Sequence, residues 1–264
     1  MLAEKSKQPI DSYDPRLWVA EEKFDGHRVL LFVHQRGQHA DVVLRSRSWK
    51  LKKMSDGFLA AARKLAAGIY DGELCASDAE GRSWNVPTAI NAGSERLIVF
   101  DLLELVGEET ESLSLRKRRE LLEQATRGRL NGRIQLSRQA KPSQALLDEI
   151  YERGGEGVIL KRLDSLYQRC RSDAWLKIKM RQEAILEVID LEEGTRPGLL
   201  TIAKIRDREG NITSVKVRNE DYVAEINRNP EKTIGRWMEI EYQVRTPDGN
   251  YRHPMMKRWV GEED

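Results

Sequence analysis

A lysine near the start of the sequence stands among residues that could do chemistry. Lys23 is followed by Asp25, Gly26 and Arg28 in the pattern Lys-x-Asp-Gly-x-Arg. A lysine amine can act as a nucleophile that forms a covalent intermediate, provided that it loses its proton. A free lysine has a pKa of about 10.4, so nearby cations that favour the neutral amine would assist it. The simpler interpretation is a charged turn of an ordinary hairpin, because Asp-Gly is a strong hairpin signal.

Other segments with chemically capable residues follow Lys23 along the chain. They contain a Ser-Arg pair, two Gly-Glu pairs, an aromatic residue beside an aspartate, and two lysines separated by one residue. In order, they are Ser46-Arg47, Asp71-Gly72-Glu73-Leu74, Val99-Phe100-Asp101-Leu102-Leu103, Gly155-Glu156-Gly157-Val158-Ile159-Leu160-Lys161 and Trp175-Leu176-Lys177-Ile178-Lys179. The Lys23 segment alone only suggests a site of covalent chemistry, but the whole series of segments indicates such a site strongly.

This series resembles the motifs of the covalent nucleotidyltransferases. It is most similar to the ATP-dependent DNA ligases, whose motifs I, Ia, III, IIIa, IV and V look like these segments, with similar spacing over nearly the whole chain. The resemblance implies ATP and Mg²⁺ as cofactors and nicked double-stranded DNA as the partner. It also implies that Lys23 becomes adenylylated, that AMP then passes to a 5′-phosphate, and that a 3′-hydroxyl displaces the AMP.

The resemblance implies roles for the other residues of these segments. Glu21 would contact the edge of the adenine and Phe100 its face, although an aromatic residue in a strand usually packs in a core. Glu73 would lie near the ribose and Glu156 would bind the metal, with Glu73 and Asp25 as further metal candidates, because Mg²⁺ prefers carboxylate oxygens. The cations expected to serve the nucleotide are Arg28, Arg47, Arg171, Lys177, Lys179 and Arg252.

The chain departs from the family pattern at two places. After Arg47 the family's motif Ia usually continues with a small or polar residue and Gly, whereas Ser48 and Trp49 follow in this sequence. Motif VI is only approximated, by residues 252–258, where Arg252 would orient the pyrophosphate of ATP.

Apolar periodicity predicts the elements that must position these residues. Apolar runs predict strands on both sides of the Asp25-Gly26 turn, and spacings of three and four residues predict helices. The expected strands are Leu17–Ala20, Val29–Val33, Val42–Arg47, Ile69–Leu74, Arg96–Asp101, Val158–Lys161 and Ala174–Lys179, and the expected helices are Met54–Ala67, Ser114–Ala125 and Ser143–Arg153. Strands outnumber helices and return through hairpins, so the fold class is α+β. The resemblance implies a nucleotidyltransferase (adenylation) domain of antiparallel sheets with helices.

A domain boundary is expected near residues 181–184, which divides the chain into residues 1–182 and 183–264. Beyond it, short alternating strands are separated by turn signals at regular spacing, which suits a small five-stranded, all-β barrel. Several classes of barrel share this pattern, and the family resemblance favours an OB-fold that swings about a hinge near residues 179–183.

Composition sets limits on the location of the protein but does not identify its partner. The 264 residues include 45 Lys and Arg against 43 Asp and Glu, a net charge of +2, which does not by itself predict a polyanion partner. No long apolar run or secretory signal is found, and Cys75 and Cys170 are too few for a disulfide framework. We therefore expect a cytoplasmic protein in a reducing compartment, monomeric, without a membrane partner or structural zinc. The basic run Arg116–Arg119 suits either a solvated helix face or a phosphate-contacting surface.

Two other functions remain open at this point. An RNA ligase or an mRNA-capping guanylyltransferase shares the Lys-x-Asp-Gly pattern, and an inactive nucleic-acid-binding relative would keep the fold without the chemistry. The intact set of motif residues weighs against the inactive relative. We expect no separate DNA-binding domain before the Lys23 segment, so two loops are predicted to contact DNA: Ser77–Gly93, with Arg82 and Trp84, and Gly194–Gly198.

Overall fold

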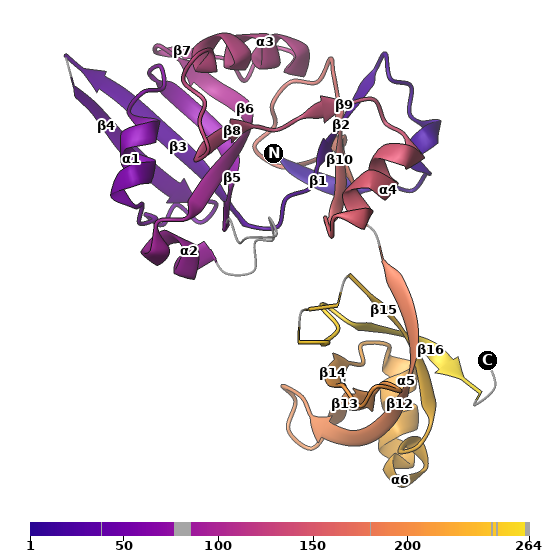
Figure 1. Cartoon of the computed structure of the whole chain (residues 1–264). Helices are drawn as coiled ribbons and strands as arrows, with labels where there is room; N and C mark the ends of the chain where they lie inside the picture. The colour runs from indigo at the N-terminus through magenta and orange to yellow at the C-terminus, as the bar shows by residue number, and fades with distance from the viewer. Residues whose placement is uncertain (38, 77–85, 180, 244, 247, 262–264) are drawn as a thin grey trace. The chain divides into compact units, whose positions relative to one another are not determined.

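The computed structural model describes residues 1–37, 39–76, 86–179, 181–243, 245–246 and 248–261. The chain divides into two units, Met1–Lys179 and Met180–Asp264, each with its own sheet structure and apolar core (Figure 1). Within the described part of the chain, none of the helices has the length and apolar character needed to span a bilayer.

The first unit is built on two sheets. One has the order β4-β3-β5-β6-β7, with β8 paired to β6, and the other has the order β1-β11-β10-β2-β9. The strands of the former are β3 (His27–Arg36), β4 (His39–Ser46), β5 (Gly68–Ala76), β6 (Glu95–Leu105), β7 (Glu108–Glu109) and β8 (Ile134–Leu136). Those of the latter are β1 (Leu2–Lys5), β2 (Trp18–Glu22), β9 (Gln139–Ala140), β10 (Gly157–Arg162) and β11 (Arg171–Lys179). Pairing is mostly antiparallel, as expected, although β1 with β11 and β6 with β8 are parallel.

The predicted hairpin at Asp25-Gly26 is wrong. β2 pairs with β9 and β10, whereas β3 pairs with β4 and β5, so residues 23–26 carry the chain from one sheet to the other. Gly26 is required for a close approach rather than for a turn, because a Cβ atom there would lie 2.3 Å from the carbonyl oxygen of Leu74. The segment that carries Lys23 is therefore fixed from both sheets.

The helices of the first unit lie at positions that the sequence largely indicates. They are α1 (Asp56–Ala62), α2 (Val86–Ala92), α3 (Leu115–Thr126) and α4 (Gln144–Glu152), and a single 3₁₀ turn covers Ile10–Ser12. α1, α2 and α3 contact the sheet that contains β3, and α4 contacts β10 of the other sheet. The side chains of Ser55, Ser114 and Ser143 accept backbone hydrogen bonds at the starts of α1, α3 and α4, as good N-caps do. The expected helix Met54–Ala67 is shorter than predicted, and α2 lies where a loop was expected.

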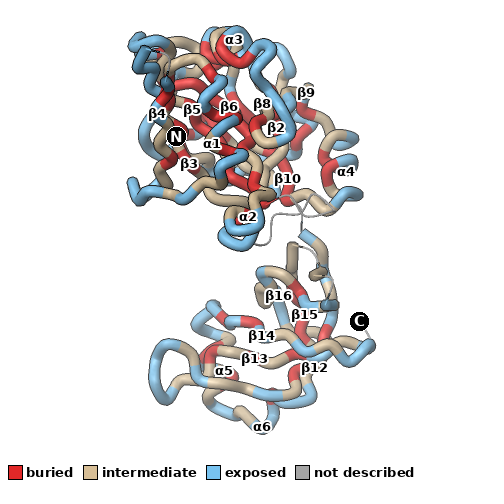
Figure 2. Tube along the Cα trace, turned by 60° about the vertical axis from the view of Figure 1, so that its left-hand side comes forward, coloured by how far each residue is buried: buried red, intermediate tan, exposed pale blue. Residues whose placement is uncertain are grey.

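The main core of the first unit lies between the first sheet and its helices. Val29, Leu31 and Val33 alternate along β3 and pack with Phe58 of α1 and Leu122 of α3. In Figure 2 many buried residues run along the strands, whereas exposed residues lie on connecting loops and on the outer faces of helices. The opposite side of β3, which carries the intervening residues, is left to line cavities.

Arg118 in α3 has neither of the roles considered for the basic run 116–119. Its side chain is fully buried and donates to both carboxylate oxygens of Asp101 in β6, at 2.7 and 2.9 Å. The remaining donors reach the carbonyl oxygens of Leu113 and Ser165. Arg118 therefore joins α3 to the sheet.

The second unit contains a five-stranded antiparallel sheet of order β14-β13-β12-β15-β16. Its strands are β12 (Gln182–Glu193), β13 (Leu200–Arg206), β14 (Ile212–Lys216), β15 (Trp237–Tyr242) and β16 (Met255–Val260). Residues of β14 and β16, the two outer strands, also come into contact. The unit is not all-β as expected, because α5 (Glu220–Arg228) and α6 (Pro230–Thr233) follow β14. Asn219 caps α5, which buries Val223 and Ile226 in the core of this unit.

Candidate active site

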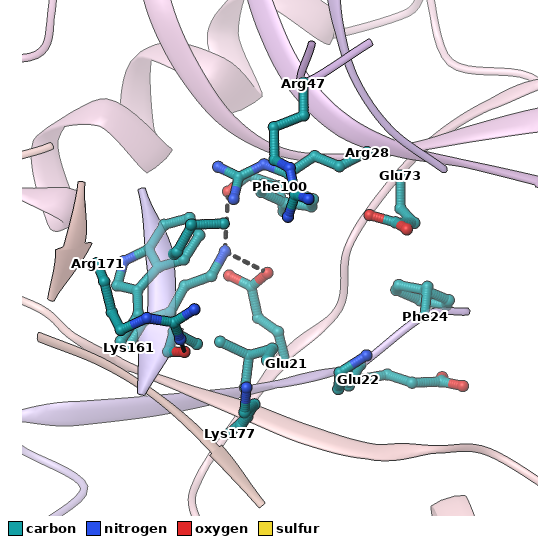
Figure 3. Close-up of a pocket in the computed structure, with 15 residues that line it drawn as sticks. Glu21, Glu22, Phe24, Arg28, Arg47, Glu73, Phe100, Lys161, Arg171 and Lys177 are labelled. Atoms are coloured by element: carbon teal, nitrogen blue, oxygen red, sulfur yellow. Dashed lines mark hydrogen bonds and ion pairs between the residues drawn. The ribbon is translucent and has the colours of Figure 1, made fainter. Parts of the chain in front are cut away.

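A cavity of about 270 Å³ in the first unit collects most of the residues singled out from the sequence. Side chains from both sheets line it (Figure 3). Its cations are Lys23, Arg28, Arg47, Lys161, Arg171 and Lys177, its carboxylates are Glu21, Glu22 and Glu73, and its aromatic residues are Phe24, Phe100 and Trp175. Cations outnumber carboxylates on this wall, which suits a ligand that carries phosphate groups.

Lys23 is held by a buried carboxylate. Its ammonium donates a hydrogen bond to Oε2 of Glu156, and Lys179 pairs with Oε1 of the same side chain. The backbone N–H of Lys23 also donates to the carbonyl oxygen of Gly157, at 2.8 Å. Burial alone would raise the pKa of Glu156, but the charges and hydrogen bonds of the two lysines hold it below its ordinary value. Glu156 is therefore an ionised group that fixes the Lys23 amine.

Lys177 adds a second amine to the same region. It lies two residues before Lys179 on β11, and the two-residue spacing predicts that both side chains share one face of the strand. Lys177 lines the cavity, while Lys179 reaches Glu156 beside it. Burial, together with the charges of Arg171, Lys179 and Lys23, lowers the pKa of Lys177. The local field around the cavity is therefore positive.

Arg28 is anchored by its neighbours as well as lining the cavity. Its Nε donates to Oδ1 of Asp71 at 3.0 Å, and a terminal nitrogen donates to Oδ2 at 2.5 Å. Tyr167 donates to the same Asp71 oxygen at 2.8 Å, and the carbonyl of Met1 accepts another bond from Arg28. Burial would lower the pKa of Arg28, but the Asp71 charge raises it well above its ordinary value. The guanidinium, stacked 5.4 Å from the Phe100 ring centroid, is thus a fixed positive charge.

Glu21 and Lys161, which both line the cavity, form a buried ion pair. Both side chains are 2% exposed, and Lys161 Nζ lies 2.8 Å from Oε2 of Glu21 (Figure 3). Ser137 donates to the same oxygen, and Gln139 donates to Oε1 at 2.8 Å. The pair spans neighbouring strands, because Ile159 of β10 faces Glu21 of β2 and Lys161 follows two residues later.

Lys161 also organises the aromatic residues of the cavity. Its ammonium lies 4.5 Å from the ring centroid of Phe100 and 4.3 Å from that of Trp175, and it donates to the carbonyl oxygen of Phe100 at 3.3 Å. The Phe100 and Trp175 rings meet edge to face, with centroids 5.9 Å apart. Sequence reasoning gave Lys161 no role, although it ends the Glu156 segment and shares a strand face with Ile159, another cavity residue.

Glu73 is a predicted site residue whose pKa is strongly shifted by its surroundings. Burial raises the pKa of its carboxyl to about 7, against the opposing influence of Lys23 and Arg28, and the Asp71 charge adds to the rise. Glu73 lies on β5 opposite Arg28 of β3. Its carboxyl therefore changes charge near neutral pH in the ligand-free protein.

The predicted metal candidates do not assemble into one ligand set. Among the residues that the structure describes, no group of three or more His, Cys, Asp or Glu side chains could hold a metal ion. Glu73 lines the cavity, Glu156 is engaged by two lysines, and Asp25 lies on the segment between the sheets. Mg²⁺ at nucleotide sites is often held by one or two carboxylates together with substrate phosphates and water, so a full protein cage is not needed.

The remaining predicted residues lie in different places. Arg47 and Arg171 line the cavity, and Arg171 also donates to the carbonyl oxygen of Ala3 at 2.7 Å. Arg252 belongs to the second unit, where its carbonyl oxygen accepts from the backbone of Gln243. Of the predicted contact loop Ser77–Gly93, residues 77–85, with Arg82 and Trp84, lie outside the described residues.

Comparison with known proteins identifies the family. The model of the ATP dependent DNA ligase domain matches residues 1–179. The chain belongs to this family. The resemblance inferred from the motifs is thereby confirmed, and the cavity with Lys23 lies within the ligase domain.

Relatives extend the comparison beyond residue 179. The multifunctional non-homologous end joining protein LigD of Pseudomonas aeruginosa is 30% identical over 188 residues, which cover 68% of this chain and 22% of that protein. A DNA ligase of Thermococcus fumicolans is 30% identical over 259 residues, which cover 85% of this chain and 46% of that protein. The chain thus spans less than half the length of these two ligase relatives.

A solved structure from a structure-function study of Lig E DNA ligases shares the fold. It superposes with a TM-score of 0.74 at 19% identity, and the match covers 98% of both chains. The overall architecture of this ligase-family chain is therefore that of a known DNA ligase fold.

Proposed function

We propose that this chain is an ATP-dependent DNA ligase, which seals nicks in duplex DNA through a lysyl-AMP intermediate on Lys23. The observation that carries the proposal is the amine of Lys23, held by the buried Glu156 on the wall of a cationic cavity in a ligase-family domain. Neither an inactive relative nor a binding module needs a nucleophile fixed in this way.

Lys23 carries out the first transfer. Its deprotonated Nζ attacks the α-phosphorus of ATP, so that a phosphorus–nitrogen bond forms and the bond to pyrophosphate breaks. Glu156 keeps the amine oriented, and Lys177 supplies positive charge beside the phosphates. The same wall offers Arg47 and Arg171 to the phosphate groups.

The nucleobase end of the cavity is the Phe100 and Glu21 wall. Phe100 would stack on the adenine, and Glu21 would accept a hydrogen bond from its edge. Support comes from the fixed geometry of both groups, since Lys161 bonds to the Glu21 carboxylate and to the Phe100 carbonyl oxygen. A rigid site of this kind loses little entropy when the nucleotide binds.

Mg²⁺ is part of the proposal because the reaction concentrates negative charge. A bound magnesium ion would offset charge on the phosphates as a Lewis acid. The carboxylate donor set favours such a hard cation, with Glu73 on the cavity wall and Asp25 and Glu156 as the other candidates. Lys23, Lys177 and Lys179 would then share the remaining charge neutralisation.

We also propose two domains, an adenylation domain at residues 1–182 and an OB-fold domain at residues 183–264. Support for the second comes from its five-stranded antiparallel sheet, whose outer strands β14 and β16 meet as strands of a closing barrel do. Arg252 in this domain would orient the pyrophosphate of ATP. The two free cysteines, Cys75 and Cys170, suit a reducing, cytoplasmic location, and we propose that the protein is a monomer.

Nick sealing by the purified chain tests the proposal. A labelled duplex with one nick, incubated with ATP and Mg²⁺, should yield the sealed strand, and the Lys23→Ala variant should yield none. Lys117→Ala is the matched control, since Lys117 is a surface residue of α3 paired with Glu120, and it should seal normally. Sealing of nicked RNA but not DNA, or transfer from GTP but not ATP, would overturn the assignment in favour of an RNA ligase or a capping enzyme.

A further inference from the structure

Trp49 occupies a backbone position that ordinarily selects glycine. Its φ is 61°, in the left-handed region, at the end of a three-residue loop that follows β4. The N–H of Trp49 donates to the carbonyl of Ser46 at 2.8 Å, and Arg45 bridges to Leu51 across the loop. Such loops place a left-handed residue at their third position, where a bulky side chain is strained. A large aromatic residue kept there calls for a functional explanation.

The Trp49 side chain is also exposed to solvent, and neighbouring side chains fix its position. It is 60% exposed, which is unusual for so large an apolar group. Its ring centroid lies 6.3 Å from that of Phe32 and 5.9 Å from the Arg45 guanidinium, which also donates to the Trp49 carbonyl oxygen at 2.9 Å. The ring is therefore supported on one side and available to a ligand.

The cavity beside Trp49 adjoins the active-site cavity, because the two share lining residues. Trp49 lines a largely apolar cavity of about 250 Å³ together with Phe32 and Ile69. This cavity shares Leu2, Arg28 and Arg47 with the cavity that holds Lys23. Its two acidic lining residues are already neutralised, Asp71 by Arg28 and Glu111 by Arg169.

The loop of Trp49 also borders a basic hollow of about 530 Å³. Its charged and titratable lining residues are His27, Arg28, Arg47, Lys50, Lys52 and a single carboxylate, Glu73. Arg47 and Ser46 belong to both the apolar cavity and this hollow. An aromatic ring beside a basic channel is the arrangement with which proteins hold a single nucleic-acid strand, because bases stack on the ring and phosphates follow the cations.

We propose that Trp49 stacks on the base next to the reacting phosphate, on the face where the nick breaks the strand and leaves no covalently joined neighbour, with the phosphates of that strand in the basic hollow. This inference rests on the proposed ligase function and adds a specific DNA contact to it. A protein partner fits less well, since the hollow is cationic and both cavities share Arg28 and Arg47 with the nucleotide site.

Two substitutions of Trp49 distinguish the effect of its ring from the effect of its backbone conformation. Trp49→Gly removes the ring and suits the left-handed φ, whereas Trp49→Phe keeps an aromatic ring. In the nick-sealing assay, Trp49→Gly should raise the KM for nicked DNA about 5- to 150-fold, the range expected for loss of one stacked base. Trp49→Phe should remain within about 3-fold of the parent, because it retains a stacking surface.

Val106→Gly is the matched control for the backbone change. Val106 also has a positive φ, 52°, and is 71% exposed, in the turn between β6 and β7. Both glycine variants should resist urea better than the parent, but Val106→Gly should leave the KM for DNA unchanged. An equal KM for Trp49→Gly and the parent would overturn the stacking role. A change in oligomeric state of Trp49→Gly on sedimentation, with no change in that KM, would instead assign Trp49 to contact with a second copy.

Formation of lysyl-AMP, which requires no DNA, distinguishes failure of the proposed ligase function from failure of the inference about Trp49. If the parent protein forms no lysyl-AMP, the proposed function fails. If the parent forms it and seals nicks, but Trp49→Gly seals at the parental KM, only the inference about Trp49 fails.

Discussion

Two ion pairs beside the active-site cavity of the first unit contrast with an exposed ion pair of the second unit. In the first unit, Glu21 with Lys161 and Arg28 with Asp71 bury at least one carboxylate completely or nearly so beside one cavity. In the second unit, pairs such as Arg206 with Glu187 lie on exposed strand faces, where the two side chains are 48% and 31% exposed. Burying charges costs solvation energy that their attraction often fails to recover. The two buried pairs therefore lie where they position groups of the active-site cavity, whereas Arg206 and Glu187 lie where water already solvates them. The second unit also has a nearly buried carboxylate, Glu239, which is 7% exposed and pairs with Lys257 and Arg258.

The largest expected change in the free energy of unfolding comes from breaking the buried ion pair between Glu21 and Lys161. Lys161→Met leaves Glu21 charged and buried with only Ser137 and Gln139 as partners, so it should lower the free energy of unfolding by about 3–5 kcal/mol. Urea denaturation of the purified variant measures this. Adding Glu21→Gln to Lys161→Met should restore much of the loss, because no unpaired buried charge remains. A single variant as stable as the parent would contradict the role given to the pair.

A smaller effect is expected from Glu73, a largely buried acid whose carboxyl accepts a hydrogen bond from the backbone of Gly26. The pKa of Glu73 is about 7 in the folded chain and near 4.5 when unfolded, so the folded state binds its proton more tightly. Its contribution to stability is full below pH 4.5 and is lost as the pH rises through 7, a change of about 3 kcal/mol. Glu73→Gln should remove this fall from the pH profile of the free energy of unfolding. An identical fall in the variant and the parent would assign it to other groups.

The smallest effect is expected from the surface pairs of the second unit. Arg206→Met, chemically matched to Lys161→Met, should change the free energy of unfolding by at most about 0.5 kcal/mol, because water and salt screen an exposed pair. Parallel urea titrations of the two variants compare the units directly. A loss for Arg206→Met as large as that for Lys161→Met would remove the distinction between them.

Local patterns in the sequence predict individual elements better than their pairing. The helices at Ser114–Ala125 and Ser143–Arg153 agree with α3 and α4 to within two residues, because serine caps and apolar spacing are local signals. The hairpin at Asp25-Gly26 is wrong because strand partners are chosen by tertiary packing, which here brings Gly26 against β5. The helix α5 is missed although Asn219 caps it.

The sequence likewise predicts the residues of the candidate site better than the contacts between them. Motif spacing selects eight residues that line one cavity, including Lys23, Glu73 and Phe100. It does not reveal that Lys161 ties Glu21 to Phe100, because that contact depends on the register between β2 and β10. Nor does it reveal that both oxygens of Glu156 are taken by lysines.

Intact-protein mass spectrometry after incubation with ATP and Mg²⁺ tests the central proposal most directly. We predict a gain of one AMP that survives acid-free denaturation, maps to Lys23 in peptide digests and is absent from Lys23→Ala. No gain in the folded parent protein, or an AMP group on a different side chain, would contradict the account.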